Sequence, residues 1–130
     1  MSILKNKIKN SSMEFLFGGR ELQAFTIKKC VNFPKKYRPY LGQELIKISA
    51  NINEKLVCAN TIHPNNEFEK CKKIEFFADA IAYLNCLVEQ LEIANELLYI
   101  NKKDLQKWGF IITEEIELIK EQIDMVEIKQ

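Results

Sequence analysis

The chain has 130 residues, is 47% hydrophobic and 28% charged, and carries a formal net charge of +1. That length predicts one domain with a buried core, and a content of only 4 glycines and 3 prolines argues against a turn-rich β fold. No apolar run approaches the ~18 residues of a membrane span, and no signal-peptide core follows the basic N-terminus, so we expect a cytoplasmic protein.

The near-neutral total hides two halves of opposite charge. Residues 1–75 contain 14 Lys and Arg against 7 Asp and Glu, a balance of +7, whereas residues 76–130 contain 5 against 11, a balance of −6. The basic half is suited to bind an anionic partner or the acidic half of a neighbouring subunit.

The N-terminal part of the chain is predicted to be a flexible arm over residues 1–19. It lacks a sustained apolar period and contains the pair Gly18-Gly19, which is expected to break any helix begun before it. A first helix is predicted over about residues 20–33, because Pro34 disfavours helical geometry in the residue before it.

A second helix is predicted over about residues 39–62, because a proline at position 39 suits a first helical turn and apolar residues follow at steps of three and four. These residues are Leu41, Leu45, Ile48, Ile52, Leu56, Ala59 and Ile62. Such near-heptad spacing is typical of helices that pack against others at a shallow angle. A loop with His63 and Pro64 is predicted to follow.

The third predicted helix spans about residues 67–99 and is apolar over a wide arc. Its main apolar face contains Ile74, Phe77, Ala78, Ile81, Leu84, Val88, Leu91, Asn95 and Leu98. A second apolar face includes Phe76, Ala80, Tyr83 and Leu87. Because a helix inside a bundle needs only one broad buried face, we predict that these four residues form an oligomer interface.

A fourth helix is predicted over about residues 102–125, with Asn101 as its N-terminal cap, apolar residues at steps of three and four, and an acidic outer face. Four helices with short connections predict an all-α fold, an up-down-up-down four-helix bundle over residues 20–130. The alternative is a helical hairpin that completes its core only when it oligomerises.

The segment between the first two helices is the best candidate for a binding surface. It places cations beside two tyrosines, a composition suited to phosphate contacts and base stacking. The predicted nucleic-acid-binding residues are Lys28, Lys29, Lys35, Lys36, Tyr37, Arg38 and Tyr40. For the two tyrosines, packing over the helix ends is an equal alternative.

The same segment resembles a known sequence signature. Phe33-Pro34-Lys35-Lys36-Tyr37-Arg38, two further residues and Leu41-Gly42-Gln43-Glu44-Leu45 are similar to the FPK-x-x-R-x-x-LG-x-x-hydrophobic signature of a bacterial four-helix-bundle family. That family includes the ribosomal RNA intervening-sequence proteins and the accessory variability determinant of diversity-generating retroelements. Looser similarity extends over about residues 20–126.

The resemblance implies a bundle that assembles into a ring-like pentamer and binds nucleic acid through a basic surface. In the retroelement members it also implies a reverse transcriptase as partner. The cations that match the signature here are Lys35, Lys36 and Arg38, with Lys28 and Lys29 as neighbours.

Residue patterns for catalysis or metal binding are missing from the sequence. The single histidine, His63, has no Glu three residues before it, so the Glu-x-x-His pairs of carboxylate-bridged metal bundles are absent. There is no glycine-rich phosphate loop. The four cysteines form no CxxC motif and are predicted to be free thiols in or near the core. We therefore expect a non-enzymatic protein without a cofactor or metal.

Two functions are compatible with these observations. The first is an oligomeric accessory protein that binds RNA or DNA through its basic surface, with a reverse transcriptase as the partner that the resemblance implies. The second is a protein–protein adaptor without a nucleic-acid role, which the near-neutral total charge and the acidic fourth helix favour.

Overall fold

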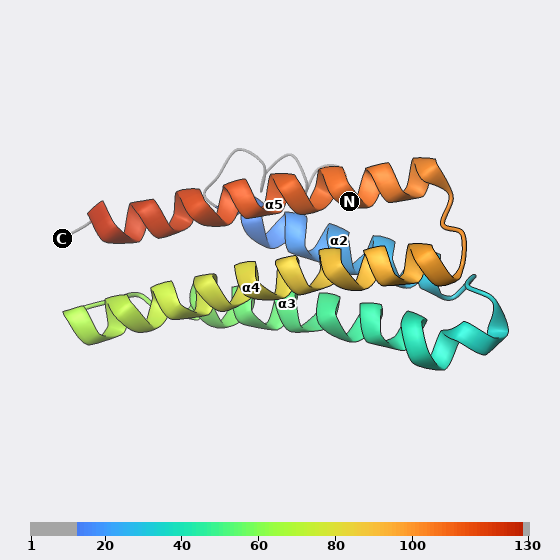
Figure 1. The fold of residues 1–130 in the computed structure, drawn as a ribbon. Helices are drawn as coiled ribbons and strands as arrows, with labels where there is room; N and C mark the ends of the chain where they lie inside the picture. The colour runs from blue at the N-terminus through green and yellow to red at the C-terminus, as the bar shows by residue number, and fades with distance from the viewer. Residues whose placement is uncertain (1–12, 129–130) are drawn as a thin grey trace.

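The computed structural model describes residues 13–128, which form an all-α, up-and-down four-helix bundle (Figure 1). Its elements are α2 (Glu14–Cys30), the short helical turns η1 (Lys35–Tyr37) and η2 (Arg38–Gly42), α3 (Gln43–Thr61), α4 (Glu67–Leu97) and α5 (Lys102–Ile128). Successive helices pack against each other, and α5 closes the bundle against α2. The predicted fold class is confirmed, and the predicted bounds of the last three helices agree closely with the observed ones.

The start of α2 differs from the prediction. The helix begins at Glu14 rather than near residue 20, and it runs unbroken through Gly18 and Gly19. The prediction of a break at this glycine pair is therefore wrong, as is that of an arm reaching residue 19. The predicted arm's residues 1–12 lie outside the described residues.

The two glycines in α2 allow neighbouring helices to approach closely. A Cβ at Gly19 would lie 2.7 Å from Leu56 Cδ1 of α3, and a Cβ at Gly18 would collide with Glu115 Oε1 of α5. Each glycine costs a helix roughly 1 kcal/mol relative to alanine. The close packing against α3 and α5 offsets that cost and explains why the helix continues.

The connection between α2 and α3 is a corner shaped by its two prolines. α2 ends at Cys30, and the chain adopts extended geometry at Pro34, where φ is −52° and ψ is 139°. Pro39 lies in the first turn of η2, as its restricted φ favours, and η2 continues directly into α3. η2 lies against the end of α2 at Gly42, where a Cβ would be in ordinary van der Waals contact with the Cys30 carbonyl oxygen at 3.4 Å.

Side chains satisfy backbone groups on both sides of the α3–α4 connection. Asn66 Oδ1 accepts a hydrogen bond from the Glu69 backbone N–H at 2.8 Å, and the Glu69 carboxylate accepts one from the preceding loop at 2.7 Å. This is a reciprocal cap of α4. Lys73 Nζ donates to the carbonyl oxygens of Ala59 and Ile62, each at 2.8 Å, so a cation lies at the negative end of the α3 dipole.

The apolar surface of α4 is divided differently from the prediction. Its buried residues alternate at steps of three and four and are Phe77, Ala80, Leu84, Leu87, Leu91 and Ala94. Val88, predicted to lie in the core, is exposed. The true core face thus takes residues from both predicted faces, which overlap around the helix.

The core of the bundle contains Trp108, which lies in the second turn of α5 and is fully buried. Its indole N–H donates a hydrogen bond to Thr26 Oγ1 of α2 at 2.9 Å, and its ring meets Phe25 edge-on with ring centroids 5.2 Å apart. Polar and aromatic contacts therefore join α2 to α5. Among the helices of residues 13–128, none is long and apolar enough to cross a membrane.

Candidate nucleic-acid interface

The cations of the corner reach solvent, as predicted. Lys35 and Lys36 in η1 and Arg38 at the start of η2 are exposed. Arg38 also supports the corner, because its Nε donates a hydrogen bond to the Phe33 carbonyl oxygen at 2.8 Å. This bond uses one of the five guanidinium donors, so Arg38 combines a structural role with an exposed charge.

The two tyrosines of the corner have different environments. Tyr37 is half-buried and packs against the core, with Lys36 Nζ 5.1 Å from the centre of its ring. For Tyr37, the structure thus agrees with the alternative in which the ring packs over a helix end. Tyr40 is 76% exposed, so its ring is open to a stacking base.

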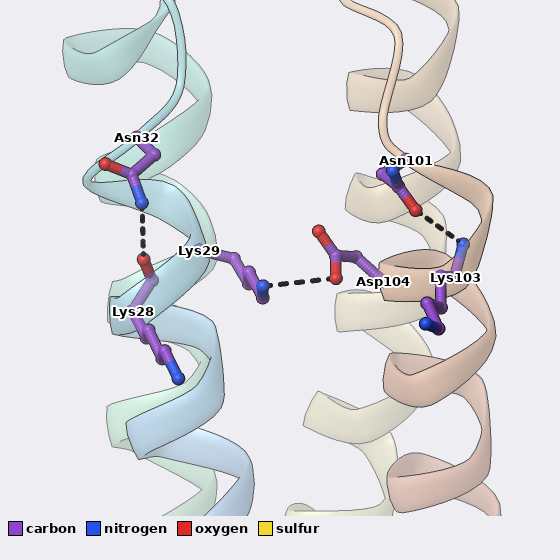
Figure 2. Close-up of polar contacts among 6 residues, drawn as sticks. All are labelled: Lys28, Lys29, Asn32, Asn101, Lys103 and Asp104. Carbon is purple, nitrogen blue, oxygen red and sulfur yellow. Dashed lines mark hydrogen bonds and ion pairs between the residues drawn. The ribbon is translucent and has the colours of Figure 1, made fainter.

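The last turn of α2 lies beside the first turn of α5 (Figure 2). Lys29 Nζ is 3.1 Å from Asp104 Oδ1, and the two side chains are 29% and 31% exposed. Lys28 is exposed, and its carbonyl oxygen accepts a hydrogen bond from Asn32 Nδ2 at 3.4 Å. Of these two predicted contact residues, Lys29 is therefore held in an ion pair with α5, whereas Lys28 extends into solvent.

Three lysines that the sequence prediction did not include lie at the start of α5. Lys102 and Lys103 follow Asn101, whose Oδ1 caps the helix by accepting a hydrogen bond from the Lys103 backbone N–H at 2.8 Å, as predicted. Lys107 Nζ lies 5.1 Å from the centre of the Phe25 ring of α2. In an up-down bundle the first connection, here the corner, and the third connection, here that between α4 and α5, lie at the same end. The predicted topology could therefore have placed these lysines beside the corner.

We call this end of the bundle the basic end. Its exposed cations are Lys28, Lys35, Lys36, Arg38, Lys102, Lys103 and Lys107. Glu44 and Glu96 are exposed carboxylates at the same end, and Asp104 is paired with Lys29. Cations are therefore in excess there, and they come from α2, the corner and α5.

The predicted oligomer interface on α4 needs correction. Ala80 and Leu87 are fully buried within a single bundle, because they face the other helices, and they cannot meet a second copy. Phe76 is half-buried, and two lysine ammonium groups lie 5.5 and 5.3 Å from the centre of its ring. Tyr83 is half-buried and packs at the edge of the core. Oligomerisation itself stays a prediction.

The other side chains with reactive chemistry are dispersed. His63 is exposed in the α3–α4 connection, as predicted. The thiols are free, with Cys30 buried, Cys58 half-buried, and Cys71 and Cys86 exposed, so the prediction of a core position is wrong for the last two. Burial raises the pKa of the Cys30 thiol to about 12. Within residues 13–128, no group of three or more His, Cys, Asp or Glu is arranged to hold a metal ion.

A buried carboxyl group on α5 was missed by the sequence prediction. Glu115 is 1% exposed, and in the described part of the chain neither of its carboxylate oxygens has a hydrogen-bond partner. Desolvation, followed by the charges of Glu21, Glu14 and Glu114, raises the pKa of Glu115 to about 9. Glu115 lies three or four residues from buried isoleucines of α5, and this spacing could have predicted that it shares their buried face.

Fold and site together define a helical bundle with one basic end. Comparison with models of known protein families gave no match, and comparisons with curated proteins and with solved structures gave no significant match. The similarity of the corner to the intervening-sequence and retroelement family therefore stays a prediction.

Proposed function

We propose that this protein is a non-enzymatic accessory protein that binds RNA or DNA through the basic end of its bundle. The observation that carries the proposal is the gathering of exposed cations from three separate segments beside the exposed ring of Tyr40. An ion pair between Lys29 and Asp104 holds two of these segments, α2 and α5, in register. A partner with many closely spaced negative charges fits such a surface.

Lysine and arginine side chains bind a phosphate backbone without regard to sequence, because they displace its condensed counterions. A ring such as Tyr40 adds stacking on an unpaired base, worth ~1–3 kcal/mol per base. The basic end has both kinds of group. We therefore propose single-stranded nucleic acid, or an unpaired loop, as its preferred target. Assembly into a pentamer and a reverse transcriptase as partner follow from the resemblance of the corner and belong to the same proposal.

The test compares two pairs of charge-neutralising substitutions. K35Q/K36Q removes two cations from the corner, and K72Q/K120Q removes two exposed cations from parts of α4 and α5 away from the basic end. Binding of a labelled single strand is measured by fluorescence anisotropy over a range of salt concentrations.

The corner pair is expected to weaken binding and to flatten the dependence of log Kd on log salt. The slope should fall by roughly 0.7 for each lysine that contacts a phosphate of a single strand. The control pair should leave the slope close to that of the unsubstituted protein. Equal curves for the two pairs would refute a role for the corner.

A second candidate function is a protein–protein adaptor. It is favoured by Phe110, which is 67% exposed on α5 near the carboxylates of Glu114 and Glu117. Aromatic residues are frequent among the side chains that dominate binding at protein interfaces. Two results together would select this function. The unsubstituted protein would retain a protein partner after nuclease treatment but would not shift labelled nucleic acid, and the F110A variant would lose that partner.

A further inference from the structure

We propose that the cavity between α2 and α5 binds an organic cation, specifically a primary ammonium or guanidinium group on a short alkyl chain. The cavity has a volume of about 240 Å³, and the residues that carry the proposal are Glu14, Phe17, Glu21, Phe110, Glu114 and Glu115. Along α5, Glu115 lies roughly 12 Å from Lys107, the nearest basic-end cation on this helix, at about 1.5 Å per helical residue. None of the basic-end cations lines the cavity. The proposal is thus independent of the proposed nucleic-acid function.

The feature that points to a ligand is the carboxylate of Glu115. Glu115 is one of the residues that line the cavity and is 1% exposed, yet in the described residues neither of its carboxylate oxygens accepts a hydrogen bond. Buried polar groups in proteins are nearly always hydrogen-bonded, because an unpaired one loses its solvation without compensation. Gly18 contributes no side chain to this wall, so the carboxylate lies directly against the α2 backbone. A donor that enters the cavity would supply the missing hydrogen bonds.

The lining of the cavity selects the chemistry of that donor. Three further carboxylates, those of Glu14, Glu21 and Glu114, favour a positive charge. Because both oxygens of Glu115 lack a hydrogen-bond donor in the described residues, a cation that carries its own N–H groups fits best. The side chains of Phe17 and Phe110 line the cavity and provide apolar walls for an alkyl chain. An alkylammonium or alkylguanidinium meets all three conditions.

Binding of such a cation is coupled to proton release. The charged groups around Glu115 are Glu14 and Glu21 from α2 and Glu114 from α5, and desolvation together with these three charges raises the pKa of Glu115 to about 9. Near neutral pH its carboxyl group is therefore protonated. A bound cation favours the ionised form, so about one proton should leave for each cation bound, and the affinity should increase with pH.

The experiment titrates the full-length protein with n-butylammonium chloride and, separately, with n-butylguanidinium chloride. Amide NMR spectra should show saturable shifts centred on Gly18, Ile111 and Glu115, with a Kd on the order of 1 mM for so small a ligand. 1-Butanol has the same alkyl chain without the charge and should cause no saturable shift. Calorimetry in two buffers of different ionisation enthalpy measures the released proton.

The key variants are E115Q and E117Q. E115Q should bind at least about tenfold more weakly and should release no proton, whereas E117Q, which changes an exposed carboxylate outside the cavity lining, should keep both the affinity and the proton release. E115Q is expected to fold, since it replaces a carboxyl group that is neutral near pH 7 by a neutral amide of similar shape.

Two sources of the cation are distinguished by a third variant, K5S/K7S/K9S, which removes the three lysines that precede Met13. A higher affinity for n-butylammonium in this variant identifies the protein's own N-terminal lysines as competitors for the cavity. An unchanged affinity identifies a separate amine as the ligand. If neither the unsubstituted protein nor the triple variant binds either probe, or if E115Q binds as well as the parent, the proposal is overturned.

Discussion

The carboxylate of Glu115 occupies the space in which a side chain at Gly18 would lie. A Cβ at position 18 would therefore displace the end of the Glu115 side chain, which now packs directly against α2. The same packing leaves the carboxylate buried and without a hydrogen-bond partner in the described residues. The side chain at position 18 of α2 and the ionisation of Glu115 on α5 are thus linked, and we expect changes at either position to alter the stability of the bundle.

The stability of the protein should decrease as the pH rises from about 4.5 to about 9, because the pKa of Glu115 is raised from 4.5 to about 9 by folding. Below the lower value the group is protonated in both the folded and the unfolded chain and has no effect. Above it the unfolded chain loses the proton first, so the contribution of Glu115 to the free energy of unfolding falls by ~1.4 kcal/mol per pH unit.

E115Q should remove this dependence. Near pH 7 it is expected to be more stable than the parent by about 3 kcal/mol, and near pH 4.5 the two should be similar. Urea unfolding at a series of pH values measures the difference. E117Q, which alters an exposed carboxylate two residues away, is the matched control. A constant difference between E115Q and the parent across this range would contradict a raised pKa in the folded state.

Alanine substitutions at two helical glycines should have opposite effects. G18A is expected to reduce the free energy of unfolding by about 1–2 kcal/mol, since the new Cβ collides with Glu115 Oε1 and outweighs the gain in helix propensity. G109A is expected to raise it by up to ~1 kcal/mol, because a Cβ there has no atom within 4 Å. Thermal unfolding of both variants tests the pair, and stabilisation by G18A would show that the Glu115 side chain moves away from the new Cβ at little cost.

The buried hydrogen bond between Trp108 and Thr26 should contribute to stability. T26V keeps the shape of the side chain but leaves the indole N–H unpaired in the core, which is expected to cost about 1–3 kcal/mol. T26S keeps the hydroxyl group and loses only a methyl group, so it should be less destabilising than T26V. Urea unfolding followed by tryptophan fluorescence compares them, and the reverse order would show that packing rather than hydrogen bonding matters at this position.

The four thiols should react with an alkylating reagent in an order set by their exposure. Cys71 and Cys86 are exposed and are expected to react first, and Cys58 more slowly. Cys30 should react only when the bundle opens, because burial blocks access and raises the pKa of its thiol to about 12. Mass spectrometry of peptides after timed alkylation gives the four rates. Fast modification of Cys30 in the native protein would show that the corner is not packed against α2.

Much of the fold could be predicted from local sequence. Steps of three and four residues between apolar positions predicted α3, α4 and α5, and Pro34 and Pro39 predicted the corner, because these signals depend only on helical geometry and on the restricted φ of proline. The candidate binding residues of the corner could be proposed for the same reason, since a solvent-exposed connection follows from the helices beside it.

The rest depended on which helix faces meet. Gly18 and Gly19 favour a break as an isolated pair, yet they are accommodated where α3 and α5 come close. Apolar residues around α4 were compatible with two different buried faces, and only its packing against α3 and α5 placed Ala80 and Leu87 inside. Glu115 was missed because a carboxylate is expected at the surface.

By itself, the sequence determined the class of fold, the approximate helices and the exposed corner, because helix periodicity and proline geometry are local properties. The tertiary structure decided that the lysines of α5 join those of the corner at the basic end. It also decided that a glycine pair sits in a continuous helix, and that Glu115 is buried in a cavity between α2 and α5. The physical reason is the same in each case: burial and proximity arise from contacts between segments far apart in the chain, and no local pattern records which segments those are.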